Sequence, residues 1–418
     1  MTDLSALKSL KSHADALSSG LAALIDAETP GTNPGTDPGT GGPGTDPATG
    51  TDPGTDPGPG TDPGTGTDTG PTPPATPPVV GNAVAKDVAG IVQAVKDGKT
   101  DIKVRKGALG ALLLTGLNPT VSVFISPEDV RDAAEFTRIA ASKSSNISVG
   151  NFGVVPTTPN AMDGTPNYLV TADAACTGLM FYGLEIAGRD DANDFDRWTE
   201  ADWKSWAWSA IQLAGPGNQS AVCRAVGVQY GFSSIAPNNL FSRNSLDGFS
   251  GDAFRLNRDG SAAEDCVVQN SIHIDIGPAG PAGDDHPDAF QAFGKRDPAT
   301  GKYADLAKVR IERNTVIEWS RPTISPLRGK LQGVGMYNGR LIGAIVRDNV
   351  FELTSFTGIT LNSGQGCDVS GNKWRHLDRL ASADFPRVKI SGTGNTVRNN
   401  RAPKFLTPVD ATNVTAPF

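Results

Sequence analysis

The stretch IERN, residues 311–314, is one of six copies of a short pattern in the second half of the chain. Each copy has an apolar residue, two variable residues and an asparagine. The other copies are FSRN (241–244), VVQN (267–270), VRDN (346–349), VSGN (369–372) and VRNN (397–400), with MFYG (180–183) as a degenerate earlier copy. Successive asparagines are 26, 44, 35, 23 and 28 residues apart. Spacings of about 25 residues in strand-like sequence predict the coils of a solenoid, and the longer intervals predict loops inserted between coils.

The repeated asparagine suits a tight turn between two strands. Asparagine tolerates a left-handed φ, and its side chain can bind the backbone or the stacked copy in the next coil. Stacked rungs lie about 4.8 Å apart. We therefore expect one corner of the solenoid to contain Asn244, Asn270, Asn314, Asn349, Asn372 and Asn400.

A solenoid coil cannot bury its own apolar face, so the first coil needs a cap. Residues 82–97 place five valine and isoleucine side chains on one helical face, and Gly98 follows. This segment is the predicted N-terminal capping helix. A second short helix is predicted at 126–136, where a serine cap precedes a proline and Asp129 follows three residues after the serine.

Two different segments precede the solenoid. Residues 1–29 contain a predicted helix with leucine and alanine at heptad spacing, either a weak coiled coil or an amphipathic helix that docks on another protein. Residues 30–80 are a low-complexity linker in which TDP occurs five times, and its proline and glycine content prevents a packed core. The predicted organisation is an attachment or oligomerisation helix (1–29), a disordered linker (30–80) and a solenoid domain (81–418).

Composition excludes several functions. The net charge is −8, and a nucleic-acid partner would favour a basic stripe, so we expect no nucleic acid. No run of about 18 apolar residues predicts a membrane span, and the N-terminus shows no Sec signal peptide. The four cysteines are far apart with no CxxC pair, so we interpret them as buried small hydrophobic residues: Cys176, Cys223, Cys266 and Cys367.

The coils resemble the right-handed parallel β-helix of the pectate-lyase-like superfamily over about residues 100–405. The layout of N-terminal helix, linker and β-helix is similar to bacteriophage tailspikes and other virion fibres. This resemblance implies an all-β solenoid with short capping helices, a homotrimer, a location on the virion surface, and attachment to a virion protein through the N-terminal helix. The implied ligand is a bacterial capsular polysaccharide, exopolysaccharide or lipopolysaccharide in a lateral groove.

The resemblance does not fix a reaction, because the superfamily includes lyases, hydrolases, epimerases and proteins that only bind. Three interpretations stay open. The chain is a spike that binds and depolymerises a surface polysaccharide, a non-catalytic receptor-binding adhesion fibre, or a free polysaccharide lyase or glycoside hydrolase.

A second repeated strand brings two carboxylates together. It occurs as DAFRLN (252–257), DAFQAF (288–293), GVGMYN (333–338) and TGITLN (357–362). Asp252 and Asp288 begin equivalent strands, so they are expected to lie about 5 Å apart, where two carboxylates cannot both ionise freely. Such a pair serves as acid and base or as acid and nucleophile in glycoside hydrolysis. Arg255 and Gln291 are predicted to point outward beside the pair and bind substrate, and Met336 is predicted to point outward as well.

The loop before the second strand adds further candidates. In PAGDDHPDAFQAF (281–293), Asp285 is a third candidate acid and His286 an assisting base. Asp284 is the candidate ligand of a hard cation such as Ca²⁺, which similar enzymes often use. The alternative is a solvated loop tip with a backbone cap at the strand start.

Two inserted loops contain candidate sugar-binding side chains. Arg321 and Arg328, in SRPTISPLRGK (320–330), would neutralise a uronate carboxylate, although the segment also fits a flexible basic loop. In the tryptophan-rich segment 189–213, Trp198 and Trp208 are candidates for stacking on sugar rings, and a capping box predicts a helix at 200–207. The alternative is that the tryptophans pack this loop on the solenoid.

Overall fold

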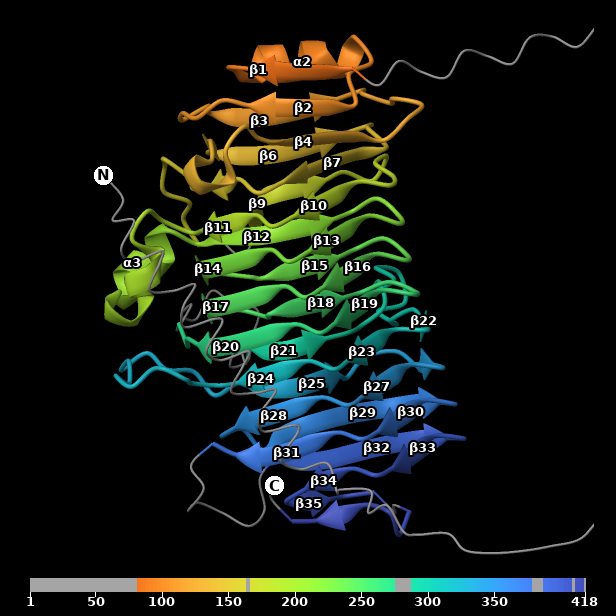
Figure 1. Cartoon of the computed structure of the whole chain (residues 1–418). Coiled ribbons are helices and arrows are strands. Elements are labelled where there is room, and N and C mark those ends of the chain that lie inside the picture. Colours follow the sequence, from red (N-terminus) through yellow and green to blue (C-terminus); the bar gives the residue numbers. More distant parts are fainter. Residues whose placement is uncertain (1–80, 163–165, 275–286, 378–385, 408–409, 417–418) are drawn as a thin grey trace, which may run out of the picture. The chain divides into compact units, whose positions relative to one another are not determined.

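The computed structural model describes residues 81–162, 166–274, 287–377, 386–407 and 410–416. Within these ranges the chain winds into stacked coils, and each full coil contributes one strand to each of three parallel sheets (Figure 1). The predicted right-handed parallel β-helix is confirmed. The predicted helix in residues 1–29 and the linker at 30–80 lie outside the described residues.

The three sheets, named A, B and C, follow one another around every coil. Sheet A contains, in stacking order, β1 (Asn82–Ala85), β2 (Asp101–Val104), β4 (Val123–Pro127), β7 (Ile147–Gly150), β10 (Met180–Tyr182), β13 (Gln219–Ala221), β16 (Leu240–Ser242), β19 (Ala262–Glu264), β23 (Arg310–Glu312), β27 (Ile345–Arg347), β30 (Asp368–Ser370) and β33 (Thr396–Arg398). Sheet B contains β5 (Glu135–Phe136), β8 (Gly153–Val154), β11 (Glu185–Ala187), β14 (Arg224–Val228), β17 (Ser245–Phe249), β20 (Val267–Ser271), β24 (Thr315–Ile317), β28 (Val350–Leu353), β31 (Lys373–His376), β34 (Arg401–Ala402) and β36 (Val414–Thr415).

Sheet C is the face on which the candidate site lies. Its strands are β3 (Ala111–Thr115), β6 (Arg138–Ser142), β9 (Asn167–Ala172), β12 (Trp208–Leu213), β15 (Phe232–Ser234), β18 (Phe254–Leu256), β21 (Asp288–Gln291), β25 (Gln332–Met336), β29 (Thr357–Gln365), β32 (Arg387–Thr393) and β35 (Lys404–Phe405), with the short β22 (Leu306–Ala307) and β26 (Leu341–Ile342) joined to β29.

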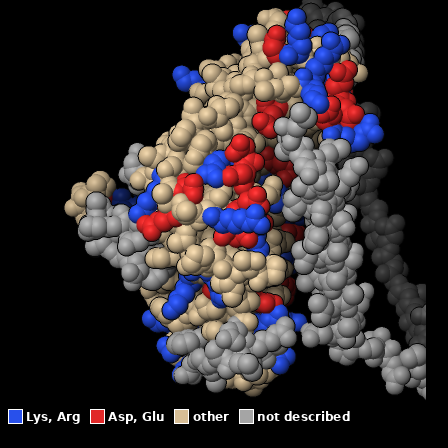
Figure 2. Space-filling model, turned by 90° about the vertical axis from the view of Figure 1, so that its left-hand side faces the viewer, with Lys and Arg blue, Asp and Glu red and all other residues tan. Residues whose placement is uncertain are grey.

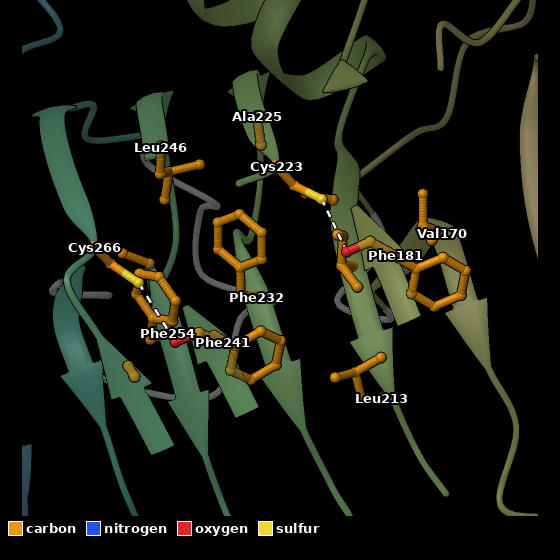
Figure 3. Packing of buried hydrophobic residues seen from close by; sticks show 14 of the residues in the cluster. Val170, Phe181, Leu213, Cys223, Ala225, Phe232, Phe241, Leu246, Phe254 and Cys266 are labelled. Carbon is orange, nitrogen blue, oxygen red and sulfur yellow. Dashed lines mark hydrogen bonds between the residues drawn. The ribbon is translucent and has the colours of Figure 1, made fainter. Parts of the chain in front are cut away.

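Stacked aromatic rings fill the interior of the central coils. Phe232, Phe254 and Phe290 occupy the same position in three successive strands of sheet C. Their ring centroids are 4.9 and 5.2 Å apart, close to the spacing of the rungs. Figure 3 shows Phe232 and Phe254 with Phe241 from sheet A inside the coil. Each ring therefore packs on its copies above and below, which fixes the register of β18, which follows Asp252, and of β21, which begins at Asp288.

One column of asparagines joins sheet A to sheet B, as predicted, for five of the six residues. The corner residues are Asn244, Asn314, Asn349, Asn372 and Asn400, and each is at most 1% exposed. Their side chains form a ladder, since the backbone N–H of each of Asn314, Asn349 and Asn372 donates to the side-chain oxygen of the next asparagine.

The prediction for Asn270 is wrong, because this residue lies inside β20 in sheet B. Its φ of 62° is left-handed, and it follows Gly227 and Gly248, which have left-handed φ at the same level of β14 and β17. In that coil the corner residue is Cys266, and in an earlier coil it is Cys223. At the asparagine corner the left-handed φ belongs to the preceding residue, such as Arg243 or Arg313, and not to the asparagine itself.

Helix predictions at the N-terminal end need correction. Residues 82–97 do not form one helix: 82–85 are strand β1, and helix α2 spans Val88–Lys96 with Asp87 as its N-cap. Asp87 accepts a hydrogen bond from the Gly90 N–H at 2.7 Å, which starts the helix after the strand. Helix α2 still packs on the first coils, as a cap requires, through buried Ile91 and Val95.

The second predicted helix, 126–136, is mostly absent. Ser126 and Pro127 end strand β4, and only one 3₁₀ turn, η1 (Val130–Asp132), follows. Asp129 caps this turn by accepting from the Arg131 N–H. Among the described residues, no helix is long and apolar enough to cross a membrane.

Candidate functional site

The connections from sheet B to sheet C differ greatly in length along the solenoid. Between β14 and β15 and between β17 and β18 they are short, residues 229–231 and 250–253. The connections β11–β12, β20–β21 and β24–β25 on either side are long insertions. The two short connections contain Tyr230 and Asp252, so these residues lie at the start of sheet C strands between the bases of the insertions.

Asp252 and Asp288 lie on neighbouring rungs, as the sequence predicted. Phe254 pairs with Phe290 and Arg255 with Gln291, so the two aspartates take equivalent places before these pairs. The Asp288 N–H donates to Oδ1 of Asp252 at 3.2 Å, and the Ala253 N–H donates to the Asp288 carbonyl at 2.8 Å. Asp252 is 5% and Asp288 3% exposed, which makes this a carboxylate pair set into the surface of the sheet.

Arg255 holds the first carboxylate of the pair. Its Nε lies 2.9 Å from Oδ2 of Asp252, and its guanidinium carbon lies 4.2 Å from the centre of the Tyr230 ring. Burial alone would lower the pKa of Arg255, but the Asp252 carboxylate and the two nearby tyrosines, Tyr230 and Tyr168, raise it above its ordinary value. The ion pair stabilises the charged form of Arg255 and fixes the orientation of Asp252.

Gln291 and Tyr337 are next to the second carboxylate. Gln291 Nε2 lies 3.4 Å from Oδ2 of Asp288, a long hydrogen bond. A Cβ atom on Gly335, which pairs with Gln291 in β25, would lie 2.6 Å from the Tyr337 ring and 2.7 Å from Oδ2 of Asp288. Only glycine therefore leaves room for the ring and the carboxylate together.

Tyrosines complete the cluster. Burial, and then the negative charge of Asp288, raise the pKa of Tyr337, and its hydroxyl donates to the side-chain oxygen of Gln332. Burial also raises the pKa of Tyr168, whereas Arg255 and a hydrogen bond with Ser233 lower it. Both phenols consequently stay protonated at neutral pH and can act as hydrogen-bond donors.

Three of the five tyrosines in the chain are gathered around this pair, and none of the three was predicted from the sequence. Tyr168, Tyr230 and Tyr337 come from three separate coils and follow no shared motif. Their scarcity in the sequence was the only signal.

The prediction for Met336, which lies in the same sheet, is wrong. It was predicted to point outward, but it is 2% exposed and pairs with inward-facing Leu361. Asp288 pairs with Gln332 and not with Gly333, so the alignment of GVGMYN was one residue off. The outward residues of β25 are Gly335 and, beyond its end, Tyr337, which is why Tyr337 reaches the carboxylates.

The other acidic-loop candidates cannot be placed. Asp284, Asp285 and His286 lie outside the described residues, so their roles stay predictions. Among the residues that the structure describes, no group of three or more His, Cys, Asp or Glu side chains is placed to hold a metal ion.

The tryptophan-rich insertion folds back over sheet B. It contains the 3₁₀ segment η2 (Ala192–Arg197) and helix α3 (Glu200–Ser205), which begins at the predicted capping box and ends two residues before the predicted end. Trp198 is 5% exposed, packs edge-to-face on Trp203 at 4.9 Å, and has the Arg189 guanidinium over its ring at 4.6 Å. Its neighbours therefore occupy the surfaces that would stack on a sugar.

Trp208 lies apart from Trp198, at the start of β12 in sheet C. It is half-buried against the core, and its indole Nε1 donates to the Thr158 carbonyl at 2.9 Å. The structure does not bring it into contact with the Asp252–Asp288 pair through any described hydrogen bond or ion pair.

The two predicted arginines anchor the second insertion. Arg321 forms ion pairs with Asp196 at 3.0 Å and Asp247 at 3.3 Å, and its guanidinium lies 3.8 Å from the centre of the Phe195 ring. Arg328 pairs at 2.8 Å with Glu318, which is 1% exposed. Figure 2 shows the side of the molecule that carries α3, with basic and acidic side chains clustered together. Both guanidinium groups are therefore paired with acidic side chains of the protein itself.

Comparisons with known proteins found only remote structural similarity. No known family model and no curated protein sequence matches the chain. An alginate lyase from Paenibacillus sp. str. FPU-7 is 9% identical, with 75% of this chain and 99% of that chain covered and a TM-score of 0.46. A mannuronic acid specific polysaccharide family 6 lyase from human gut microbiota is 13% identical, with coverage of 78% and 81% and a TM-score of 0.39. The Dettilon tailspike protein is 10% identical, with coverage of 79% and 64% and a TM-score of 0.25. Similarity at this level does not inform the activity of this chain.

Proposed function

We propose that this protein binds and cleaves a polysaccharide on the outer face of sheet C, with Asp252 and Asp288 as the catalytic pair. The observation that carries the proposal is the position of the two carboxylates on adjacent rungs, linked by the 3.2 Å hydrogen bond from the Asp288 N–H to Asp252. Rungs are about 4.8 Å apart, which matches the separation of about 5–5.5 Å between the carboxyls of retaining glycosidases.

The two aspartates are in different surroundings, which assigns them different roles. The Arg255 ion pair keeps Asp252 ionised, as a nucleophile or base requires. Asp288 adjoins Gln291 and the Tyr337 phenol, and it is the proposed general acid that protonates the leaving oxygen. Gln291, whose amide has a second N–H besides the one directed at Asp288, would donate a hydrogen bond to a sugar hydroxyl.

A binding-only function is the second candidate. It is favoured by the low exposure of both carboxylates, 5% and 3%, since a catalytic acid must reach the glycosidic oxygen. Cleavage distinguishes the two functions.

The test is to incubate the full-length protein with a panel of bacterial capsular polysaccharides, exopolysaccharides and lipopolysaccharides. Size-exclusion chromatography measures chain length, and reducing ends and absorbance at about 235 nm separate hydrolysis from elimination. Shortened chains with new reducing ends and no absorbance support the proposal. A polymer that binds and stays intact supports the adhesion function. Unsaturated ends would show a lyase and contradict the assigned roles of the two aspartates.

We further propose that the protein is a homotrimeric spike or fibre on a phage virion, attached through residues 1–29. The support is the sequence pattern of a heptad-like helix followed by a linker of 51 residues (30–80). Three copies would increase a weak affinity for a repetitive glycan through avidity. Detection of the protein in purified phage particles tests this proposal. Its absence from the particles would contradict the proposal and favour the alternative of a free enzyme.

A further inference from the structure

A protruding arm follows the strand that begins with Asp288. Residues 293–305 leave sheet C after β21 and return to β22. Two backbone hydrogen bonds close the arm into a hairpin, from the Ala304 N–H to the Lys295 carbonyl at 3.0 Å and from the Asp297 N–H to the Lys302 carbonyl at 2.7 Å. At its base the rings of Phe293 and Tyr303 pack edge-to-face with centroids 6.0 Å apart. The arm is therefore a defined element and not a loose loop.

The arm borders an open surface hollow of about 530 Å³ that carries three cationic side chains. Lys295, Arg296 and Lys302 line it together with Asp297 and Tyr303, and the three cations are exposed. None of the three forms an ion pair with an acidic side chain among the described residues. The hollow has the size of a small ligand site, and its charges have no internal counterpart.

The two acidic side chains near the three cations, Asp297 and Asp305, bind other partners. Both carboxylate oxygens of Asp297 bind within the turn, to the Ala299 N–H at 2.8 Å and to the Thr300 hydroxyl at 2.7 Å. These hydrogen bonds hold the pKa of Asp297 below its ordinary value. Asp305 is paired with Arg340. On a chain of net charge −8, this hollow is a local positive site, which attracts anions that the rest of the surface repels.

The arm and the carboxylate pair can contact one extended ligand. Asp288 and Lys295 are seven residues apart on one strand and its continuation, a span of at most about 23 Å at 3.3 Å per residue. An oligosaccharide lying along the β21 strand would therefore meet both.

We propose that the 293–305 arm is an anion subsite that binds a carboxylate- or sulfate-bearing sugar of the polysaccharide. This inference rests on the proposed function, and it specifies the substrate class: an acidic polymer. The cations supply charge-assisted hydrogen bonds to the anionic group, and the fixed ring of Tyr303 contacts the sugar ring.

The experiment measures binding and not cleavage, so that its failure is separate from failure of the catalytic proposal. Full-length Asp288→Asn protein prevents turnover during the measurement. Affinities for sodium alginate, dextran sulfate and neutral dextran are measured by biolayer interferometry at two salt concentrations. The arm variant replaces Lys295, Arg296 and Lys302 by Gln. The matched control replaces Lys86, Lys96 and Lys143, three exposed lysines in the N-terminal coils, by Gln.

Each exposed ion pair contributes up to about fivefold in affinity, so the arm variant should bind the preferred anionic polymer about 10- to 100-fold more weakly. The control should bind as the parent does, and added salt should weaken the parent more than the arm variant. Preference for alginate identifies a carboxylate ligand and preference for dextran sulfate identifies a sulfate. Equal affinity for dextran, an equal loss in the control, or no binding of either anionic polymer overturns the inference. Cleavage of a neutral polymer with no effect of the arm variant would leave the proposed function intact and remove the subsite.

Discussion

The asparagine corner allows a stability prediction at Asn349, which is fully buried. Its side chain makes four hydrogen bonds: Oδ1 accepts from the backbone and side-chain nitrogens of Asn314, both at 2.9 Å, and Nδ2 donates to the Ile311 carbonyl and to Asn372, both at 2.8 Å. Asn349→Ala removes all four and leaves the buried Asn314 N–H without this acceptor. At about 1 kcal/mol for each net hydrogen bond, the expected loss in the free energy of unfolding is about 3–5 kcal/mol.

The chain itself suggests a graded variant at this position. Cys223 and Cys266 occupy the same corner, and their thiols contact the carbonyls of Phe181 and Phe241 at 3.5 and 3.6 Å (Figure 3). Cysteine thus replaces the donor of asparagine but cannot supply its acceptor. Asn349→Cys should therefore lose about 2–3 kcal/mol, less than Asn349→Ala.

Urea unfolding of the full-length variants, followed by far-UV circular dichroism, measures these losses. The matched control is Asn338→Ala at an exposed position, which should change stability by less than about 0.5 kcal/mol. A loss below 1 kcal/mol for Asn349→Ala, or equal losses for the alanine and cysteine variants, would refute the view that the amide ladder holds the corner.

Three other predictions concern the insertion, pH and attachment. Arg321→Ala removes the ion pair to Asp196 in the first insertion and the ion pair to Asp247 in β17, so chymotrypsin should cleave near the tryptophans of the first insertion several-fold faster, whereas Arg340→Ala on the surface should not change the rate. Burial raises the pKa of the thiols of Cys223 to about 11 and Cys266 to about 12 from an ordinary value of 9.0. Protonation of the two buried thiols therefore stabilises the fold fully below pH 9, and this stabilisation is lost as pH rises through 11–12. Between pH 8 and pH 10.5 the urea midpoint should fall less in the Cys223→Ala/Cys266→Ala variant than in the parent protein. An equal fall in the two proteins would contradict this prediction. Deletion of residues 1–29 should abolish incorporation into particles while the circular dichroism spectrum of the solenoid persists, and normal incorporation would show that this segment is not the anchor.

The fold was predictable because one side chain repeats at the same structural position. An asparagine every 23 to 35 residues marks the corner in the C-terminal coils, where the ladder is continuous. The pattern failed at Asn270, because a left-handed turn inside sheet B favours asparagine as strongly as the corner does. It also passed over Cys223 and Cys266, since no motif based on asparagine detects a thiol in the same role.

The carboxylate pair was predictable for a similar reason, and its surroundings were not. Asp252 and Asp288 each precede an Ala-Phe dipeptide, and the stacked phenylalanines fix their register. Tyr337 was missed because the glycines of the strand before it do not show which residues point inward and which point outward. The same ambiguity put Met336 on the wrong face. The internal partners of Arg321 lie up to 128 residues away in sequence, in another insertion and in β17, and only the folded structure shows them.

The catalytic role of the carboxylate pair is tested most directly by reducing-end release from the most susceptible polysaccharide by full-length Asp288→Asn. This substitution keeps the shape of the side chain and removes its acidic proton. With matched circular dichroism spectra and melting temperatures, turnover should fall by about 10²–10⁴-fold, the range for loss of a general acid, whereas the surface variant Asp101→Asn should keep the activity of the parent. Unchanged release by a well-folded Asp288→Asn protein would contradict the account, and the pair would then be a structural element of sheet C.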